Sequence, residues 1–236
     1  MERPWQQEAE RLLTETFRGF CAAVQQPLPP AGLRINPALS PVEAKYFVLG
    51  LEEGVFELNA EGRVRSSVLS LVVTDEPGQV FLVFEHEPLP PRLRREAVSQ
   101  LSTAVALILD RGWLPRQIEL KPPARGYGLT NDVDIVLNSI EGDLLAGVVM
   151  KRSSHELDKL KRDLGQCGKR GSHPLDNCGF PQNHATYEFC ASQKPTYLWA
   201  VAPDGETCVR LEYAEGGVIE LHEFESLPPR SLMELI

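Results

Sequence analysis

No apolar run in this 236-residue chain approaches the ~20 residues that a membrane-spanning helix requires, so we expect no membrane segment. The first residues, Met1 to Trp5, lack the apolar core of a signal peptide. The chain also lacks the Gly-x₄-Gly-Lys phosphate loop, the Gly-x-Gly-x₂-Gly dinucleotide fingerprint and the Gly-x-Ser-x-Gly nucleophile elbow. These absences exclude the familiar nucleotide-binding and serine-hydrolase signatures, and we expect a cytoplasmic protein.

Positive charge is also scarce. The chain has 24 Lys and Arg against 33 Asp and Glu, a formal net charge of −9. Proteins that grip many phosphates usually carry a basic face, because counterion release drives that binding. The exception here is residues 151–170, where seven basic residues face three acidic ones. A nucleic-acid partner is therefore compatible with one segment only, and the acidic N-terminal part suits a protein partner equally well.

The five cysteines are an odd number, and four of them lie in the last third of the chain. Because nothing points to export, a disulfide framework is the weaker interpretation, and thiol or metal chemistry is the stronger one.

Hydrophobic periodicity indicates a series of helices and strands. We expect helices at 4–24, 92–111 and 154–166, and strands at 116–121, 131–138, 144–151, 196–202, 207–213 and 218–224. Two further hairpins are predicted, one pairing Tyr46–Leu51 with Val55–Leu58 and one pairing Val68–Thr74 with Gln79–Glu85. A short helix at 41–50 is the alternative to the first hairpin. Residues 167–195 show no periodicity.

From residue 92 onward the expected order is helix, strand, strand, strand, helix, strand. This order predicts an α/β (α+β) protein with a mixed β-sheet flanked by helices. We divide the chain into residues 1–90, with a helix and β-hairpins, and residues 91–236, which form the αβββαβ core and include a Cys/His-rich loop at 167–190.

The strands at 131–138 and 144–151 carry the residues of one candidate site. Hydrolysis of a phosphodiester with Mg²⁺ needs carboxylates that hold the cation and a positive group near the attacking water. Asp134 lies on the first strand and Lys151 at the end of the second. The alternation of side chains along a strand can place an acid and a lysine on the same face.

The run from Asp134 through Lys151 into the helix starting at His155 resembles the core of the PD-(D/E)XK, or restriction-endonuclease-like, nuclease superfamily. The resemblance covers roughly residues 92–202. It implies that Asp134 binds metal, that Lys151 positions or activates water, and that nucleic acid is cleaved, as in bacterial defence or processing systems. The second acid of the family motif, two residues before the lysine, is replaced here by Val149.

Four residues are candidates for the missing acid: Glu156, Asp132, Glu96 and Glu119. We take Glu156 as the substitute, and the predicted catalytic set is then Asp134, Lys151 and Glu156. Glu156 also has a structural interpretation, because Ser153-Ser154-His155-Glu156 fits a capping box in which this side chain bonds back to the helix start.

Cysteine and histidine alternate between residues 167 and 184. Cys167 and Cys178 each begin a Cys-Gly-x₄-His unit that ends at His173 or His184. Two cysteines and two histidines form a complete tetrahedral set for a structural Zn²⁺. The alternatives are that the cysteines are simply buried, or that the two histidines line the cleft near Asp134 and Lys151.

Three hypotheses follow from the sequence. The chain is a nuclease-like protein that cleaves nucleic acid with Mg²⁺; or a catalytically inactive nuclease fold that serves as a binding or assembly module; or a zinc-stabilised domain that acts through protein partners.

Overall fold

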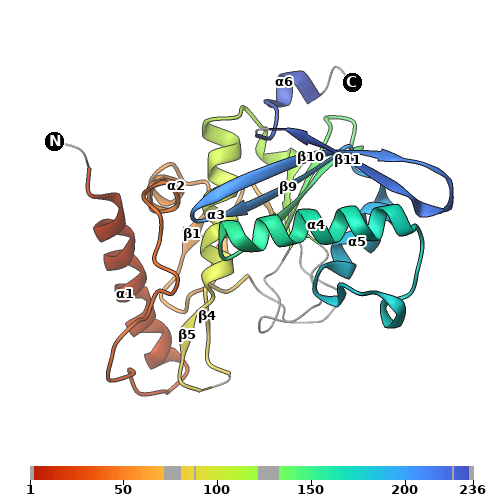
Figure 1. Ribbon diagram of the computed structural model, residues 1–236. Helices are drawn as coiled ribbons and strands as arrows, with labels where there is room; N and C mark the ends of the chain where they lie inside the picture. Colours follow the sequence, from red (N-terminus) through yellow and green to blue (C-terminus); the bar gives the residue numbers. More distant parts are fainter. Residues whose placement is uncertain (1–2, 72–80, 88, 122–132, 225, 234–236) are drawn as a thin grey trace.

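The computed structural model describes residues 3–71, 81–87, 89–121, 133–224 and 226–233. Its elements, in chain order and apart from three short 3₁₀ turns, are α1 (Trp5–Ala23), α2 (Pro41–Glu52), β1 (Glu57–Leu58), β2 (Val64–Arg65), β3 (Ser70–Leu71), β4 (Phe84–Glu85), β5 (Arg92–Leu93), α3 (Arg95–Leu109), β6 (Ile118–Leu120), β7 (Ile135–Asn138), β8 (Leu144–Met150), α4 (Ser154–Arg170), α5 (Pro181–Gln193), β9 (Tyr197–Ala202), β10 (Gly205–Tyr213), β11 (Ile219–Phe224) and α6 (Arg230–Met233). Figure 1 shows this arrangement.

A mixed sheet of seven strands forms the centre of the molecule, in the order β11-β10-β9-β8-β7-β6-β3. Strand β7 runs antiparallel to both of its neighbours, β6 and β8, whereas β9 is parallel to β8 and β3 is parallel to β6. A parallel neighbour requires a crossover connection, and α4 and α5 supply it. The sequence prediction of a mixed sheet flanked by helices is therefore confirmed.

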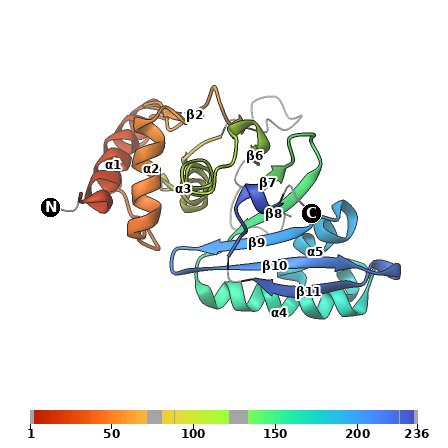
Figure 2. The same ribbon diagram turned by 90° about the horizontal axis from the view of Figure 1, so that it is seen from above.

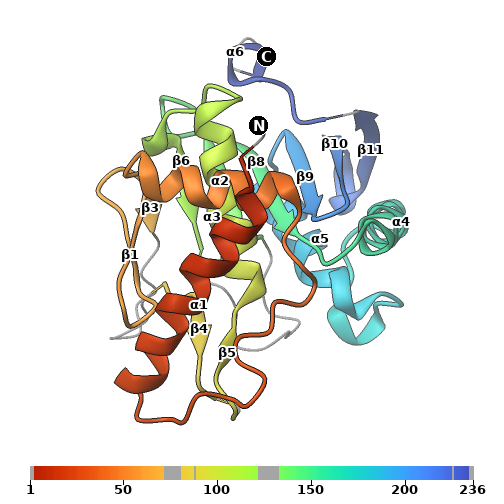
Figure 3. The same cartoon turned by 90° about the vertical axis from the view of Figure 1, so that its left-hand side faces the viewer.

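Each face of the sheet is covered by a separate apolar core. Neighbouring residues alternate between the two, so that Val148 belongs to one core and Val149 to the other. Helices α1, α2 and α3 cover the first face, and α4 lies on the other side, against β9, β10 and β11 (Figures 2 and 3). Because α3 and α4 lie on opposite faces of the sheet, side chains from both helices can meet only where the strands end.

The N-terminal residues share both the sheet and the first core. Strand β3 pairs in parallel with β6, and Leu13 and Phe17 of α1 are buried in the same core as Ile118 of β6.

The first expected hairpin was wrong. Residues Tyr46–Leu51 lie in α2, which agrees with the alternative of a helix at 41–50. Ser40 and Glu43 form a complete capping box at its start, since Ser40 Oγ accepts from Glu43 N and Glu43 Oε2 accepts from Ser40 N. This local signal fixes the helix start and outweighs the strand-like composition.

The second expected hairpin does not match the described pairings. Strand β3 pairs with β6, and β4 pairs with β5. The turn Asp75-Glu76-Pro77-Gly78 lies outside the described residues. A long-range parallel partner and a later hairpin replace the expected local pairing, and residue periodicity does not encode either of them.

Helix α5 was missed by the sequence analysis, which found no periodicity over 167–195. Both faces of this helix are enclosed, and its buried residues include Asn183, His184 and Thr186 besides apolar ones. A helix that is buried on several sides and carries polar residues inside shows no amphipathic stripe.

Helix α4 approaches β11 so closely that one glycine has no room for a side chain. A Cβ at Gly168 would lie 2.3 Å from the backbone oxygen of Ile219, whereas a Cβ at Gly165 would meet nothing nearer than a Leu221 methyl group at 3.6 Å. We expect Gly168→Ala to lower the free energy of unfolding by about 1–3 kcal/mol, the usual cost of overpacking.

Gly165→Ala on the same helix is the matched control. It should be neutral or stabilise by up to ~1 kcal/mol, because alanine favours the helix. Urea denaturation of both variants measures the difference. Equal stabilities would show that α4 can shift away from β11 without cost.

None of the helices in the described part of the chain combines the length and the apolar character that crossing a membrane demands.

Candidate functional site

The ends of β7 and β8 bring Asp134 and Lys151 together, as the sequence predicted. Strands β7 and β8 are antiparallel neighbours. Asp134 immediately precedes β7, and Lys151 immediately follows β8. The Asp134 backbone N–H donates to Val148 O at 2.8 Å, and Asp134 Oδ2 accepts from Met150 N at 2.6 Å. Both side chains line a cavity of about 520 Å³, which we call the acidic pocket.

Asp134 is almost completely buried, with 3% of its surface exposed. Its Oδ1 accepts from Gln100 Nε2 of α3 at 3.0 Å, and its carboxyl also shares a hydrogen bond with Glu96 on the same helix. Burial raises the pKa of Asp134, although the hydrogen bonds from Glu96, Met150 and Gln100 and the charge of Lys151 act in the opposite direction. Two carboxyl groups that share a hydrogen bond need either a proton or a cation between them.

Lys151 lies in the same partly desolvated environment. Burial lowers the pKa of its ammonium group, and the nearby carboxylates Asp134, Glu156 and Glu96 counteract part of this effect. Its Nζ donates to Asn183 Oδ1 of α5 at 3.1 Å. A lowered pKa makes a lysine a better candidate for proton transfer than an exposed one.

Two of the four candidate acids lie in the acidic pocket. Glu96 reaches it from α3 and contacts Asp134, and Glu156 lines it from α4. Glu119 instead lines a separate cavity of about 1230 Å³ that contains neither Asp134 nor Lys151. Asp132 lies outside the described residues. Val149 has its side chain in the apolar core beneath α4 and 4% of its surface exposed.

Among the candidate acids in the described residues, Glu96 is thus the one that contacts Asp134 directly. From the sequence, Glu96 was one of four candidates for the missing acid. One signal was available: Glu96 and Gln100 stand four residues apart on a helix whose remaining inner face is mainly apolar, and such residues share a face.

Glu156 has the structural role that its capping pattern suggested, in altered form. Its Oε2 accepts from Arg152 N at 3.1 Å, so the side chain does bond back to the start of α4. The Ser153 side chain forms no cap. Asp204 takes that role, accepting from Ser154 N at 2.6 Å and from Ser154 Oγ at 2.9 Å.

Several basic side chains line the acidic pocket beside the acids. They are Arg95, Lys151, Arg152 and Lys159, with His155 between them. Arg95 is committed to an ion pair with Glu43 at 2.6 Å and to Ser99 at 2.7 Å. The pocket therefore combines the buried Asp134 and the partly exposed Glu96 with several positive groups, a composition suited to a metal cation and a phosphate together.

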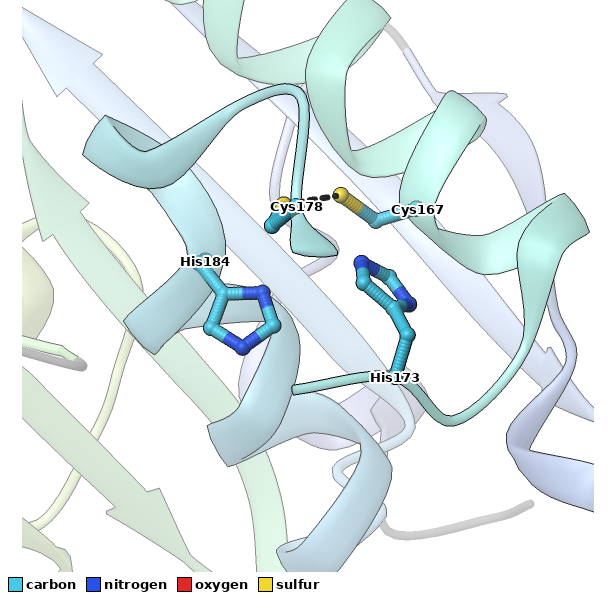
Figure 4. A group of neighbouring side chains, drawn as sticks. All are labelled: Cys167, His173, Cys178 and His184. Atoms are coloured by element: carbon cyan, nitrogen blue, oxygen red, sulfur yellow. Dashed lines mark hydrogen bonds between the residues drawn. The ribbon is translucent and has the colours of Figure 1, made fainter. Parts of the chain in front are cut away.

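The Cys/His segment folds into one cluster, shown in Figure 4. Ligand atoms of Cys167, His173, Cys178 and His184 all lie within 4.8 Å of one another, and Cys167 Sγ lies 3.6 Å from Cys178 Sγ. Cys167 comes from α4, His184 comes from α5, and the other two come from the connection between these helices. This cluster, which we call the Cys/His cluster, could hold a metal such as zinc.

The hydrogen bonding of the histidines fits a metal. His173 Nδ1 lies 2.6 Å from Gly171 O, so this nitrogen carries the proton and Nε2 keeps its lone pair. Within the described part of the chain, His173 Nε2 and both His184 ring nitrogens are buried without a hydrogen-bond partner. His184 Nε2 is 3.1 Å from Glu188 Oε1 but outside hydrogen-bonding geometry. Buried imidazole nitrogens need partners, and a metal would supply one to each histidine.

Burial, followed by the neighbouring Cys178 thiol, raises the pKa of Cys167 to about 12. A bound cation would reverse this direction, because thiolates are the form that ligates metal. The remaining cysteines, Cys21, Cys190 and Cys208, are buried and form no disulfide.

The alternative role for the histidines, lining the cleft, finds no support in the positions of their side chains. Neither His173 nor His184 is among the residues that line the acidic pocket, and His173 lines the larger cavity instead. The neighbours of His184, Gln182 and Asn183, do reach the acidic pocket.

Comparison of the chain with protein-family models, with curated proteins and with solved structures gave no match. Inference about its function therefore depends on the acidic pocket and the Cys/His cluster.

Proposed function

We propose that this protein hydrolyses phosphodiester bonds of nucleic acid in the acidic pocket, with a divalent cation such as Mg²⁺. The observation that carries the proposal is the Asp134–Glu96 carboxyl pair, which lies beside Lys151 at adjoining strand ends. The order α3-β6-β7-β8-α4-α5-β9, with α5 as an additional helix before the last strand, and the parallel pairing of β8 with β9 resemble the PD-(D/E)XK arrangement and support the same conclusion.

The residues present fit a cation. Oxygen ligands suit Mg²⁺, and Asp134 and Glu96 would hold it. Glu96 would thereby replace the acid that Val149 cannot supply. When bound, the cation supplies positive charge that stabilises the developing charge on the phosphate.

Lys151 has the central role among the chain's own groups. With its pKa lowered, its amine accepts a proton from the attacking water as the new oxygen–phosphorus bond forms. The bond between phosphorus and the leaving oxygen breaks, and that oxygen takes a proton from solvent. Arg152 and Lys159 at the pocket provide positive charge for the flanking phosphates.

In this proposal the Cys/His cluster holds a structural Zn²⁺ that joins α4 to α5. All four positions are filled by protein side chains, which is typical of structural zinc and leaves no open position for substrate. The catalytic cation and the zinc thus have separate sites in a cytoplasmic protein.

A second candidate function is a catalytically inactive nuclease fold that acts as a binding or assembly module for protein partners. Val149 favours it, because this side chain lines the acidic pocket as well as the apolar core, and a valine cannot ligate a metal there. The net charge of −9 also favours protein partners over extended contact with nucleic acid.

Cation binding and cleavage separate the two functions. We expect the wild-type protein to bind Mn²⁺, detected by electron paramagnetic resonance, and to cleave at least one substrate in a panel of labelled single-stranded and duplex DNA and RNA. Glu96→Gln should lose cation binding and reduce the rate by ~10²–10⁴-fold, the range seen when a group that acts directly in catalysis is removed.

Glu119→Gln is the matched control, because this acid lies on β6 outside the acidic pocket and its loss should leave both measurements unchanged. Absence of Mn²⁺ binding in the wild-type protein would overturn the proposed hydrolysis and favour the assembly module.

A further inference from the structure

The hydrogen-bond partner of Lys151 is an amide that is itself held by a buried acid. Asn183, with 4% of its surface exposed, accepts from Lys151 Nζ at 3.1 Å and donates from Nδ2 to Asp163 Oδ2 at 2.8 Å. Asp163 belongs to α4 and has 1% of its surface exposed. The three groups form a chain from the acidic pocket into the space between α4 and α5.

The acid determines which way the amide points. An ionised carboxylate only accepts hydrogen bonds, whereas an asparagine amide offers a donor end and an acceptor end. Asp163 therefore selects the Nδ2 end of Asn183 and leaves Oδ1 directed at Lys151, whose Nζ donates to it at 3.1 Å.

A hydrogen bond that only links two helices does not require a buried charged group. Burying a carboxylate is costly unless it is well compensated. Asp163 Oδ1 has no hydrogen-bond partner in the described residues, and the nearest cation recorded for it is Arg162, with Nε at 3.8 Å. The hydrogen bond from Asn183 Nδ2 to Asp163 Oδ2 is thus the short polar contact of this buried side chain.

The same two helices carry the Cys/His cluster. Asn183 directly precedes His184 on α5, and Asp163 lies four residues before Cys167 on α4, which places both on one face of that helix. The distance between α4 and α5 at the cluster therefore sets the distance between Asp163 and Asn183.

We propose that Asn183 and Asp163 are positioning residues for Lys151, and that a metal in the Cys/His cluster holds them in place. The proposal deepens the proposed function, since it gives the structural metal control over the orientation of Lys151 in the acidic pocket. It rests on that function for its catalytic meaning, but the position of Lys151 can be measured without any substrate.

The test is the rate at which an amine-reactive reagent labels each lysine, measured by mass spectrometry at fixed pH in the full-length, zinc-loaded protein. Labelling requires Lys151 Nζ to leave its hydrogen bond with Asn183. Loss of one hydrogen bond to a charged group shifts the equilibrium between the bonded and the released side chain about tenfold. We expect Asn183→Ala to increase labelling of Lys151 about tenfold while Lys45 on α2 and Lys161 on α4 stay unchanged. Zinc content and unfolding temperature, measured on the same sample, show that the fold is retained.

Asp163→Asn tests whether Asp163 orients the Asn183 amide or only links α4 to α5. The new amide still fits the space and can still accept from Asn183, but it no longer fixes which end of Asn183 faces Lys151. We expect zinc to be retained and Lys151 labelling to increase several-fold. Unchanged labelling would remove Asp163 from the proposal, and unchanged labelling in Asn183→Ala would overturn it entirely.

Removal of zinc by a chelator tests the link to the Cys/His cluster. In the wild-type protein it should increase Lys151 labelling to the level of Asn183→Ala, with Lys45 unaffected; no change at Lys151 would refute the coupling. The labelling results do not depend on cleavage. A protein that shows them without cleaving any substrate would retain the positioning device and contradict only the proposed hydrolysis.

Discussion

The double variant Cys178→Ser/His184→Ala is expected to lose about one zinc ion per chain and to unfold at a clearly lower temperature than the wild-type protein. The ligand atoms of the Cys/His cluster lie within 4.8 Å of one another, and three buried imidazole nitrogens there lack hydrogen-bond partners. Without metal, these groups stay desolvated and unpaired between α4 and α5.

The size of the effect follows from how much of the chain depends on the cluster. Structural zinc contributes ~10–16 kcal/mol of apparent binding free energy in small zinc-finger peptides, which are unfolded without it. Here the first apolar core contains no residue of the cluster, and Cys167 is the one cluster residue among the buried members of the second core. We therefore expect a smaller loss, of about 3–5 kcal/mol, and at ~2–4 °C per kcal/mol for a chain of this size the midpoint falls by roughly 10 °C.

Elemental analysis of protein purified without a histidine tag measures the metal, and thermal unfolding measures stability. Cys190→Ala is the control, because this thiol is buried on α5 but does not belong to the cluster. It should keep the zinc. A wild-type protein without bound metal would refute the zinc assignment.

Asp134→Asn is expected to abolish cation-dependent cleavage and, at neutral pH, to make the protein more stable. The pKa of Asp134 is raised above its ordinary value of 3.8, chiefly by burial. Because the folded state holds this proton more tightly than the unfolded state, the carboxyl favours folding below pH ~4, and the benefit disappears as the pH rises through the higher folded-state pKa. As the pH rises above ~4 the wild-type protein therefore loses stability that the variant, which has no ionisable group at this position, keeps.

The variant can also satisfy its hydrogen bonds. The introduced amide oxygen can accept from Met150 N, as Asp134 Oδ2 does now. Its amide nitrogen can donate to the Glu96 carboxyl, which now shares a hydrogen bond with the Asp134 carboxyl, and Gln100 Nε2 keeps its hydrogen bond to Lys121 O at 3.3 Å. The stability gained by removing a buried charge is therefore not offset by a buried hydrogen-bond donor without a partner.

Urea denaturation between pH 4 and pH 8 checks this prediction. The difference in unfolding free energy between Asp134→Asn and the wild type should grow with pH in favour of the variant, because Glu96 and Lys151 are then the remaining charges facing that position. Adding Mn²⁺ should stabilise the wild type alone. A variant that is less stable at every pH would show that Asp134 is a structural residue, and an active variant would exclude it as a metal ligand.

Local sequence signals predicted much of the architecture. The strands from β6 to β11 and the helices α1, α3 and α4 follow from apolar periodicity, and they were placed within a few residues of their observed bounds. Asp134 and Lys151 were brought to one site because antiparallel neighbours place residues at adjoining strand ends side by side. The four residues of the Cys/His cluster were likewise found from their spacing alone.

Features that depend on contacts distant in sequence were decided by the tertiary structure. The parallel pairing of β3 with β6 replaced the expected hairpin, and α5 showed no amphipathic period because it is enclosed on several sides. Glu96 became the partner of Asp134 only when α3 packed across the strand ends. The contact of Asn183 with Lys151 likewise required α5 to lie beside α4. Periodicity reports which face of an element is buried, whereas the partner on that face is chosen by packing of the whole chain.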